Sequence, residues 1–389
     1  MSFFNVHTHI FNLDAVPNAF VSNYNINPKL ASLLRGALKV TSIRKILLTG
    51  MRLWPSRLGN GKIKRYMALL EVAMHKSQSE VFDDLISNYD DEARFVALTM
   101  NFDFMTGEVP DTEYNNYETQ IHEILQIKKS YGDKILPFLY VDPRMGGKES
   151  LDMVRKYFSK DINLGMVGIK LYPSLGYLPF HPNLEAVYAY AEEHRIPIMT
   201  HCYKGGGTFY AGRFTHSMMS YNSFNPRPVT AAFLDAKLKP FDPNRKGRYY
   251  PDIMIDPILF EDVLTRFPKL KICMGHYGGD EEILNQYRSV SDNWTKTIKY
   301  YMKNYENVYA DVSYTLAYED VNKEIINDLK DPVLQSKILF GTDYFLVTAQ
   351  NKENKLVANF FDQLNSPQLK QLLTETNPKA YLKSDFFTP

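Results

Sequence analysis

The chain has 389 residues, of which 44% are hydrophobic and 14% aromatic, enough apolar material for a large core. Lys and Arg total 45 against 44 Asp and Glu, so the net charge is +1. That balance argues against binding to nucleic acid or to a membrane surface, both of which favour a basic excess. Because the sequence contains no run of 18 apolar residues, we expect no transmembrane helix.

The start of the chain and its cysteines indicate the compartment. The first candidate strand begins at residue 3, which leaves no room for a secretory signal before it. The two cysteines, Cys202 and Cys273, cannot form a disulfide framework, and we predict that both are thiols in the core. We therefore expect a cytoplasmic protein.

Short apolar runs recur along the chain and most are followed by a helical pattern. Helical spacing is clear in 183–194 and 257–267. Strands that alternate with helices predict a parallel sheet, and eight such units close a (β/α)8 barrel of the TIM type. A doubly wound open sheet is the alternative. The eight predicted strands lie within residues 3–11, 94–102, 134–143, 166–174, 196–203, 270–279, 307–314 and 337–345.

Two stretches are too long for ordinary connections in a single barrel domain spanning 1–389. Residues 27–93, after strand 1, read mostly as helices, and we predict a helical insertion; within it, 45–54 fits a strand equally well. Residues 203–252, after strand 5, hold eight Lys or Arg against three Asp and many aromatic residues. We predict that they form a long, lid-like loop insertion.

The first predicted strand, "FFNVHTHIF", contains two histidines one residue apart. His7 and His9 lie on the same face of a strand, because side chains alternate along it. Two imidazoles that close together suit a shared metal ion. The alternative is a pair of surface histidines on an edge strand.

Titratable residues also stand at the ends of four later strands. They are Lys170 in "GIKLYP", His201 in "THC", His276 in "GHYGG" and Asp343 in "GTD". In a barrel the carboxyl ends of all strands meet at one face, where active sites are built. These residues should therefore converge on His7 and His9. Asp311 points inward by strand parity, as part of the site or as a buried structural acid.

The ordered set HTH…GIKLYP…THC…GHYGG…GTD resembles the amidohydrolase superfamily of metal-dependent hydrolases. Within that superfamily, the sequence resembles the branch that includes the aminocarboxymuconate-semialdehyde and resorcylate decarboxylases and several lactonases. The resemblance implies a distorted barrel with one or two divalent ions held by His7, His9, His201 and Asp343. It gives His276 a role in polarising the substrate, in acid–base catalysis or in binding a second metal. Zn²⁺ suits this ligand set best, while Mn²⁺, Co²⁺ or Fe²⁺ are alternatives.

Lys170 leaves several readings open. Carbamylated, it would bridge two metals, as in part of the superfamily; as a free ammonium, it would pair with Asp343 or with an anionic substrate. The non-functional alternative is a lysine at a strand end whose ammonium group simply reaches solvent. The one-metal decarboxylases do not rely on a bridging lysine at this place, so Lys170 puts a strict one-metal site in question.

We expect a hydrolase of a small carboxylated lactone, amide or ester that uses a metal-activated water. Asp343 would take the proton from that water and pass it to the leaving group, and His276 would stabilise the oxyanion. A non-oxidative decarboxylase of an aromatic or conjugated acid is the alternative, and an inactive, ligand-binding barrel is a third reading. Partners would be a small, anionic substrate and, as an open question, further copies of the chain. Candidate substrate contacts are Arg144, Lys204 and Arg213.

Overall fold

The structure, a computed structural model, describes residues 2–12, 15–17, 20, 72, 75–110, 117–158, 165–289 and 292–389. Eight parallel strands form one sheet in the order β1 to β8, each hydrogen-bonded to the next along the chain. Each predicted strand run overlaps one of them; seven runs contain the whole strand, and β2 begins one residue before its predicted run. The strands are Phe3–Thr8 (β1), Ala93–Leu98 (β2), Ile135–Tyr140 (β3), Gly168–Leu171 (β4), Ile198–Thr200 (β5), Ile272–Met274 (β6), Val308–Asp311 (β7) and Ile338–Leu339 (β8).

The sheet closes on itself between β8 and β1. The Val6 amide donates to the carbonyl of Phe340 at 2.9 Å, and the Asp343 amide donates to the carbonyl of His7 at 2.8 Å. These bonds extend beyond β8 itself, which is only two residues long. The predicted (β/α)8 barrel is confirmed and the open sheet is wrong.

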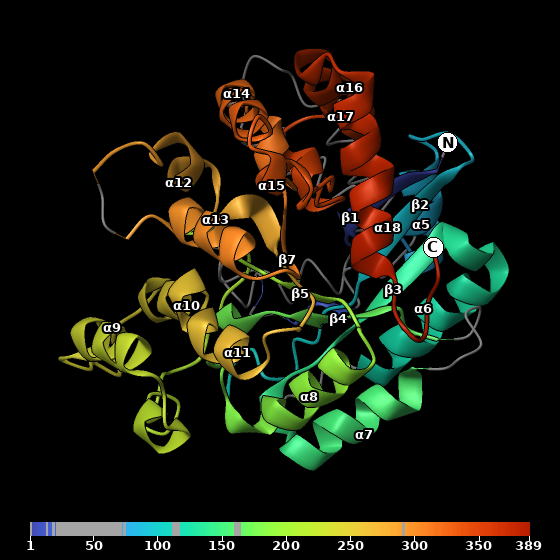
Figure 1. Cartoon of the computed structure of the whole chain (residues 1–389). Helices are drawn as coiled ribbons and strands as arrows, with labels where there is room; N and C mark the ends of the chain where they lie inside the picture. The colour runs from blue at the N-terminus through green and yellow to red at the C-terminus, as the bar shows by residue number, and fades with distance from the viewer. Residues whose placement is uncertain are drawn as a thin grey trace, which may run out of the picture.

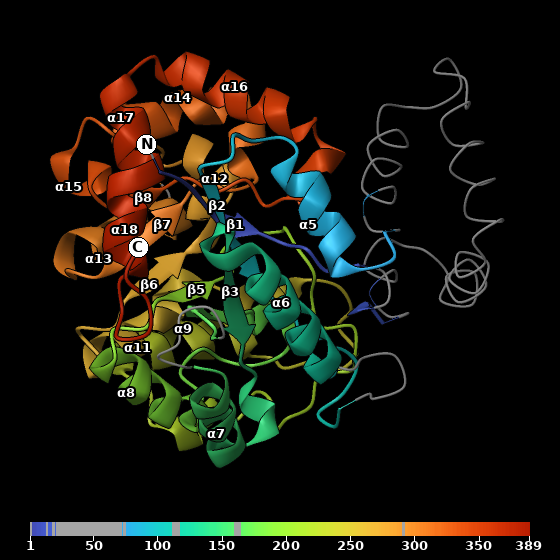
Figure 2. The ribbon, with the colours of Figure 1, turned by 90° about the vertical axis from the view of Figure 1, so that its right-hand side faces the viewer.

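Helices surround the barrel, as Figures 1 and 2 show from two sides. The two helical patterns singled out in the sequence correspond to α8 and α11, each preceded by a short 3-10 turn. The C-terminus lies beside α18 in both views. The described helices are Gln78–Ile86 (α5), Tyr117–Tyr131 (α6), Gly147–Tyr157 (α7), Glu185–Glu193 (α8), Pro228–Leu238 (α9), Tyr249–Met254 (α10), Phe260–Arg266 (α11), Asp280–Leu284 (α12), Trp294–Asn304 (α13), Glu319–Asp328 (α14), Pro332–Gln335 (α15), Glu353–Leu364 (α16), Pro367–Gln371 (α17) and Asn377–Leu382 (α18).

The register of β1 against β2 shifts between Asn5 and Thr8. Asn5 hydrogen-bonds Tyr89 and Thr342, whereas His7 contacts Asp311 on β7. Such an irregularity re-aims a side chain relative to its neighbours on the strand. In β1 it occurs at the residue that enters the candidate site.

The insertion at 203–252 is not the plain loop that its composition predicts, since it contains α9 and α10. Most of the predicted helical insertion at 27–93, including the ambiguous segment 45–54, lies outside the described residues; its described end carries α5. Within the described ranges, none of the helices has both the length and the hydropathy needed to cross a membrane.

Candidate metal centre

The two histidines of the first strand each donate one ring hydrogen to a fixed oxygen. His7 Nδ1 lies 2.9 Å from Asp311 Oδ2, and His9 Nδ1 lies 3.2 Å from the carbonyl oxygen of Leu98. A carboxylate and a carbonyl can only accept, so Nδ1 carries the hydrogen in both rings. Each Nε2 is then a bare acceptor. These two atoms lie 3.5 Å and 3.4 Å from Asp343 Oδ1.

His201 and His276, after β5 and β6, are arranged in the same way. His201 Nε2 donates to the carbonyl oxygen of Gly206 at 3.3 Å, and His276 Nδ1 donates to that of Ser313 at 3.0 Å. The remaining nitrogens, His201 Nδ1 and His276 Nε2, face each other at 3.0 Å. By this assignment neither carries a hydrogen.

Five acceptor atoms therefore carry no hydrogen, and we call them the acceptor centre: His7 Nε2, His9 Nε2, His201 Nδ1, His276 Nε2 and Asp343 Oδ1. The first two lie beside the Asp343 oxygen, and the His201 and His276 nitrogens face each other. Of these, His7 Nε2 and Asp343 Oδ1 are buried without a hydrogen-bond partner in the described part of the chain. Facing lone pairs repel unless a cation lies between them. That cation is either a proton or a metal ion.

Burial argues against the proton. It lowers the pKa of His7 to about 4, with Asp311 opposing the shift and Lys170 adding to it. Burial also lowers the pKa of His201 and of His276, and each of these rings has a further cationic neighbour in Lys170. Neutral imidazoles with one free nitrogen are the form in which histidine binds metals. The donor set thus fits a divalent ion.

Asp343 supplies the negative charge of the centre. Its backbone has a positive φ of 64°, and its amide is held by the His7 carbonyl, which fixes where the carboxylate stands. Burial raises its pKa, but the neighbouring histidines outweigh burial and the net pKa is below the usual value. Asp343 is therefore an anion at neutral pH.

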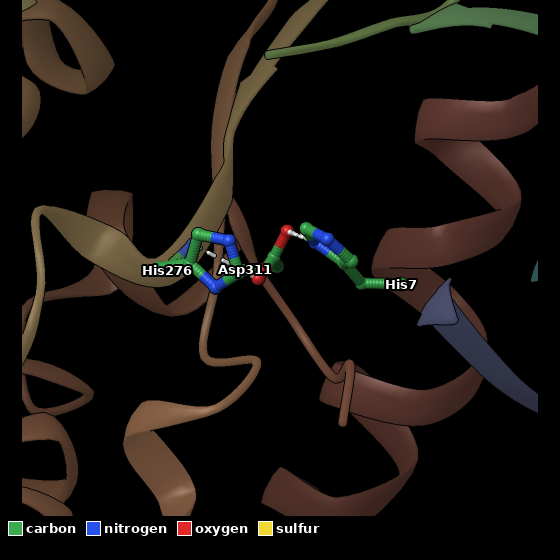
Figure 3. A group of neighbouring side chains, drawn as sticks. All are labelled: His7, His276 and Asp311. Atoms are coloured by element: carbon green, nitrogen blue, oxygen red, sulfur yellow. Dashed lines mark hydrogen bonds and ion pairs between the residues drawn. The ribbon is translucent and has the colours of Figure 1, made fainter. Parts of the chain in front are cut away.

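The described residues contain two compact groups of ligand-type atoms, and within each group all the atoms lie within 4.8 Å of one another. One group is His7, His9 and Asp343, and the other is His7, His276 and Asp311. In the second group (Figure 3) the Asp311 oxygens already accept N–H hydrogens, one from His7 Nδ1 and the other from the His276 amide at 3.1 Å. Asp311 thus orients these residues. His201 is in neither group and reaches them through His276.

Ser313 ties the two sides of the site together and was not singled out from the sequence. Its hydroxyl donates to Asp311 Oδ1 and lies 3.0 Å from His7 Nδ1 and 2.9 Å from His276 Nδ1. Only its spacing of two residues from Asp311, which predicts the same strand face, pointed to it.

Lys170, on β4, is fully buried, and its Nζ has no hydrogen-bond partner among the described residues. Burial lowers its pKa to about 8, although Asp311 and Asp343 favour the charged form. The Nζ lies 5.4 Å from the ring centre of Tyr172. Lys170 is therefore not a lysine that reaches solvent. Its position is compatible with a free amine and with a carbamylated one.

Across the residues that the structure describes, the three predicted substrate contacts form no hydrogen bond or ion pair with the residues of the acceptor centre. The Arg144 guanidinium is paired with Asp142 at 2.7 Å and packs against aromatic rings, and Lys204 is paired with Glu282 at 2.8 Å. Arg213 is exposed. The structure gives none of them a contact with the site histidines, so their role remains a prediction. Cys202 and Cys273 are buried and unpaired with each other, as expected.

Comparison with known proteins identifies the family. The chain belongs to the amidohydrolase family, whose model matches residues 153–383, more than half of the sequence. The matched segment includes Lys170, His201, His276 and Asp343. The predicted resemblance is therefore confirmed. No curated protein matches the sequence.

Solved structures show the same fold at low identity. An uncharacterised TIM-barrel protein from Bordetella bronchiseptica is 13% identical, with 98% of both chains covered and a TM-score of 0.51. The 5-carboxyvanillate decarboxylase from Novosphingobium aromaticivorans, complexed with manganese, is 14% identical over 98% of this chain and 96% of that one, with a TM-score of 0.54. A 2,6-dihydroxybenzoate decarboxylase is 12% identical over 98% and 99%, with a TM-score of 0.50.

Proposed function

We propose that the protein is a metal-dependent hydrolase of a small carboxylated lactone, amide or ester. The observation that carries the proposal is the acceptor centre, in which four histidine nitrogens and one carboxylate oxygen face one another in two sets without a hydrogen between them. Membership of the amidohydrolase family, a class of metal-dependent enzymes, supports it.

His7, His9, His201 and Asp343 would hold the metal. Zn²⁺ suits three imidazoles and a carboxylate, and Mn²⁺, Co²⁺ or Fe²⁺ suit the same set. A divalent ion bound there would supply Lewis-acid polarisation and would lower the pKa of a water molecule toward neutrality.

The chain's own residues divide the proton transfers between them. Asp343 is ionised, so it is able to accept a proton and later return it to a leaving group. His276 Nε2 is bare in the assigned tautomer, because Nδ1–H is committed to Ser313. His276 must therefore accept a proton before it can donate one to an oxyanion. This refines the role expected for it from the sequence.

Decarboxylation of an aromatic or conjugated acid is the second candidate. It is favoured by the names of two structures with the same fold, which are decarboxylases. Both reactions would use the same histidines and carboxylate, and both fit a small anionic substrate. We further propose that the protein acts in the cytoplasm and on small molecules, without nucleic-acid or membrane partners.

Product analysis separates the candidates. Metal-loaded protein is incubated with a panel of lactones, amides, esters and aryl acids, and products are weighed by mass spectrometry. Gain of one water supports the hydrolase and loss of one CO2 the lyase. Asp343→Asn should lower turnover by about 10²- to 10⁴-fold, while the control His216→Asn, at an exposed histidine outside the site, should not. Turnover of nothing by the metal-loaded protein would favour a binding protein, and near-wild-type turnover by Asp343→Asn would remove that residue's role.

A further inference from the structure

A turn of three glycines, residues 205–207, packs directly against His201; we call it the glycine turn. Gly205 and Gly207 have positive φ angles of 74° and 73°. A Cβ on Gly207 would lie 2.7 Å from His201 Nε2 and 2.2 Å from the Tyr172 hydroxyl. Only glycine allows the backbone to come this close to the imidazole.

The turn and Tyr172 fix the His201 ring from two directions. The Gly206 carbonyl accepts from Nε2 in the plane of the ring, and the Tyr172 ring stacks on its face at 4.3 Å with an interplanar angle of 22°. The Tyr172 hydroxyl in turn accepts from the Thr208 amide at 2.9 Å. Which nitrogen of His201 faces the acceptor centre thus depends on where one carbonyl points.

Arg248, beside α10 in the insertion, holds that carbonyl. Its Nη1 donates to the Gly207 oxygen at 2.6 Å and its Nη2 donates to the Gly206 oxygen. Asp252 accepts from Arg248 Nε at 3.2 Å and also lies 3.4 Å from the Gly205 amide. The guanidinium therefore spans two carbonyls with its fork, a geometry that a lysine cannot reproduce.

We propose that Arg248 is a positioning residue that, through the Gly206 carbonyl, holds His201 with Nδ1 facing the acceptor centre. A carbonyl oxygen has two lone pairs, and here one serves Arg248 and the other serves His201. Without the guanidinium, the glycine turn loses these two hydrogen bonds. The Gly206 carbonyl is then no longer fixed, and the His201 ring is no longer held in one tautomer. The inference rests on the proposed function, since it concerns a residue of the proposed metal centre.

The test compares Arg248→Met and Arg248→Lys with wild type. The dissociation constant for Mn²⁺ is measured by competition with a chromophoric chelator. Loss of a partner that orients a metal-binding histidine lowers metal affinity by about 10- to 100-fold, which is the loss expected for Arg248→Met, with partial recovery in Arg248→Lys. The matched control is Arg245→Met, since Arg245 is an exposed arginine of the same insertion that stacks on Tyr249.

A second readout does not depend on metal. Imidazole ¹⁵N chemical shifts of the metal-free protein report which nitrogen of each histidine carries the hydrogen. We expect His201 protonated at Nε2 in wild type and as a mixture of tautomers in Arg248→Met. Gly207→Ala should give the same mixture, because its Cβ displaces the turn without changing Arg248. Circular dichroism checks that each variant is folded. If Arg248→Met is unfolded, Arg248→Lys is compared with wild type in its place.

The outcomes separate the two proposals. Wild-type protein that binds no Mn²⁺ contradicts the proposed function, while the tautomer readout still decides the role of Arg248. Unchanged tautomers and affinity in folded Arg248→Met, or an equal loss in Arg245→Met, would overturn the positioning role. A loss in Gly207→Ala but not in Arg248→Met would assign the effect to the turn alone and also overturn it.

Discussion

Asp311 determines which nitrogen of His7 carries the hydrogen. In Asp311→Asn the amide NH2 would turn a donor toward Nδ1 whenever it faces the ring, and the hydrogen of His7 would then move to Nε2, inside the acceptor centre. We expect the affinity for Mn²⁺ to fall by about 10- to 100-fold, as measured by chelator competition. Burial raises the pKa of Asp311, but His7 and the other neighbours outweigh it and the net pKa is lowered, so the native residue is a carboxylate at neutral pH.

Asp262→Asn is the control for Asp311→Asn. Asp262 is equally buried and accepts from the Arg227 amide at 2.8 Å, away from the histidines. It should change stability without changing metal affinity. Equal affinities in wild type and Asp311→Asn would show that Asp311 is a structural acid only.

Lys170 decides between one metal ion and two. If its amine is carbamylated, protein purified without chelator should contain two metal ions per chain, and Lys170→Met should contain one or fewer. If the amine is free, both proteins should contain one. Elemental analysis by plasma mass spectrometry makes the measurement, and Lys271→Met, which removes a buried lysine that binds backbone carbonyls elsewhere, is the control. Absence of metal from wild type would contradict the centre itself.

At this scale the sequence predicted side chains but not their partners. His7, His9 and Asp343 could be named because strand periodicity and barrel geometry bring strand ends together. The oxygens that set the histidine tautomers are largely backbone carbonyls, those of Leu98, Gly206 and Ser313, and a carbonyl leaves no trace in residue identity. For the same reason Arg248, which acts on carbonyls, had no visible signal.

Among the elements, α16 is joined to β1 through a buried carboxyl group. Glu353 Oε1 accepts from Tyr89 at 2.5 Å and from Thr342 at 2.7 Å, and both of these residues also bond Asn5 of β1. Burial raises the pKa of Glu353 from 4.5 to about 7. The folded state therefore binds this proton more tightly than the unfolded chain does.

The pH dependence of stability follows from that difference. Below pH 4.5 both states hold the proton, and as pH rises from 4.5 to 7 the folded state loses stability relative to the unfolded one. Glu353→Gln removes the titration. It should match wild type at pH 4 and be more stable at pH 8.5, by up to about 3 kcal/mol, in urea unfolding at both pH values.

Glu375→Gln provides the contrast for this titration. The hydrogen bond from Lys379 lowers the pKa of Glu375, so its contribution has the opposite sign: it is present above the unfolded pKa and is lost as pH falls. This variant should gain no stability at pH 8.5. A Glu353→Gln variant equally less stable at both pH values would mean that hydrogen-bond geometry, not charge, dominates there.

Elements differed in how well the sequence predicted them. Buried strands are continuous apolar runs, so all eight were visible. Helix α9 was missed because its buried stripe is Thr230, Leu234 and Leu238, while Val229 is about half exposed and Phe233 only partly buried. Apolar residues outside the stripe blur the helical period, and the glycine and proline content of the insertion then predicted a loop.

At the scale of the whole molecule, the centre links the first strand to the last through His7, His9 and Asp343, with His276 from the middle of the chain. Any ion bound by the folded state alone stabilises it by RT ln(1 + [L]/Kd), about 2.7 kcal/mol at a hundredfold excess over Kd.

Removing metal with a chelator should therefore lower the unfolding midpoint, and adding Mn²⁺ or Zn²⁺ back should restore it. Scanning calorimetry of wild type and of His9→Ala makes the comparison. His9→Ala should be insensitive to both treatments, whereas His216→Ala should respond like wild type. If His9→Ala gained as much as wild type on metal addition, the ion would be bound elsewhere, because a site that depends on the first strand cannot stabilise a chain from which His9 is missing.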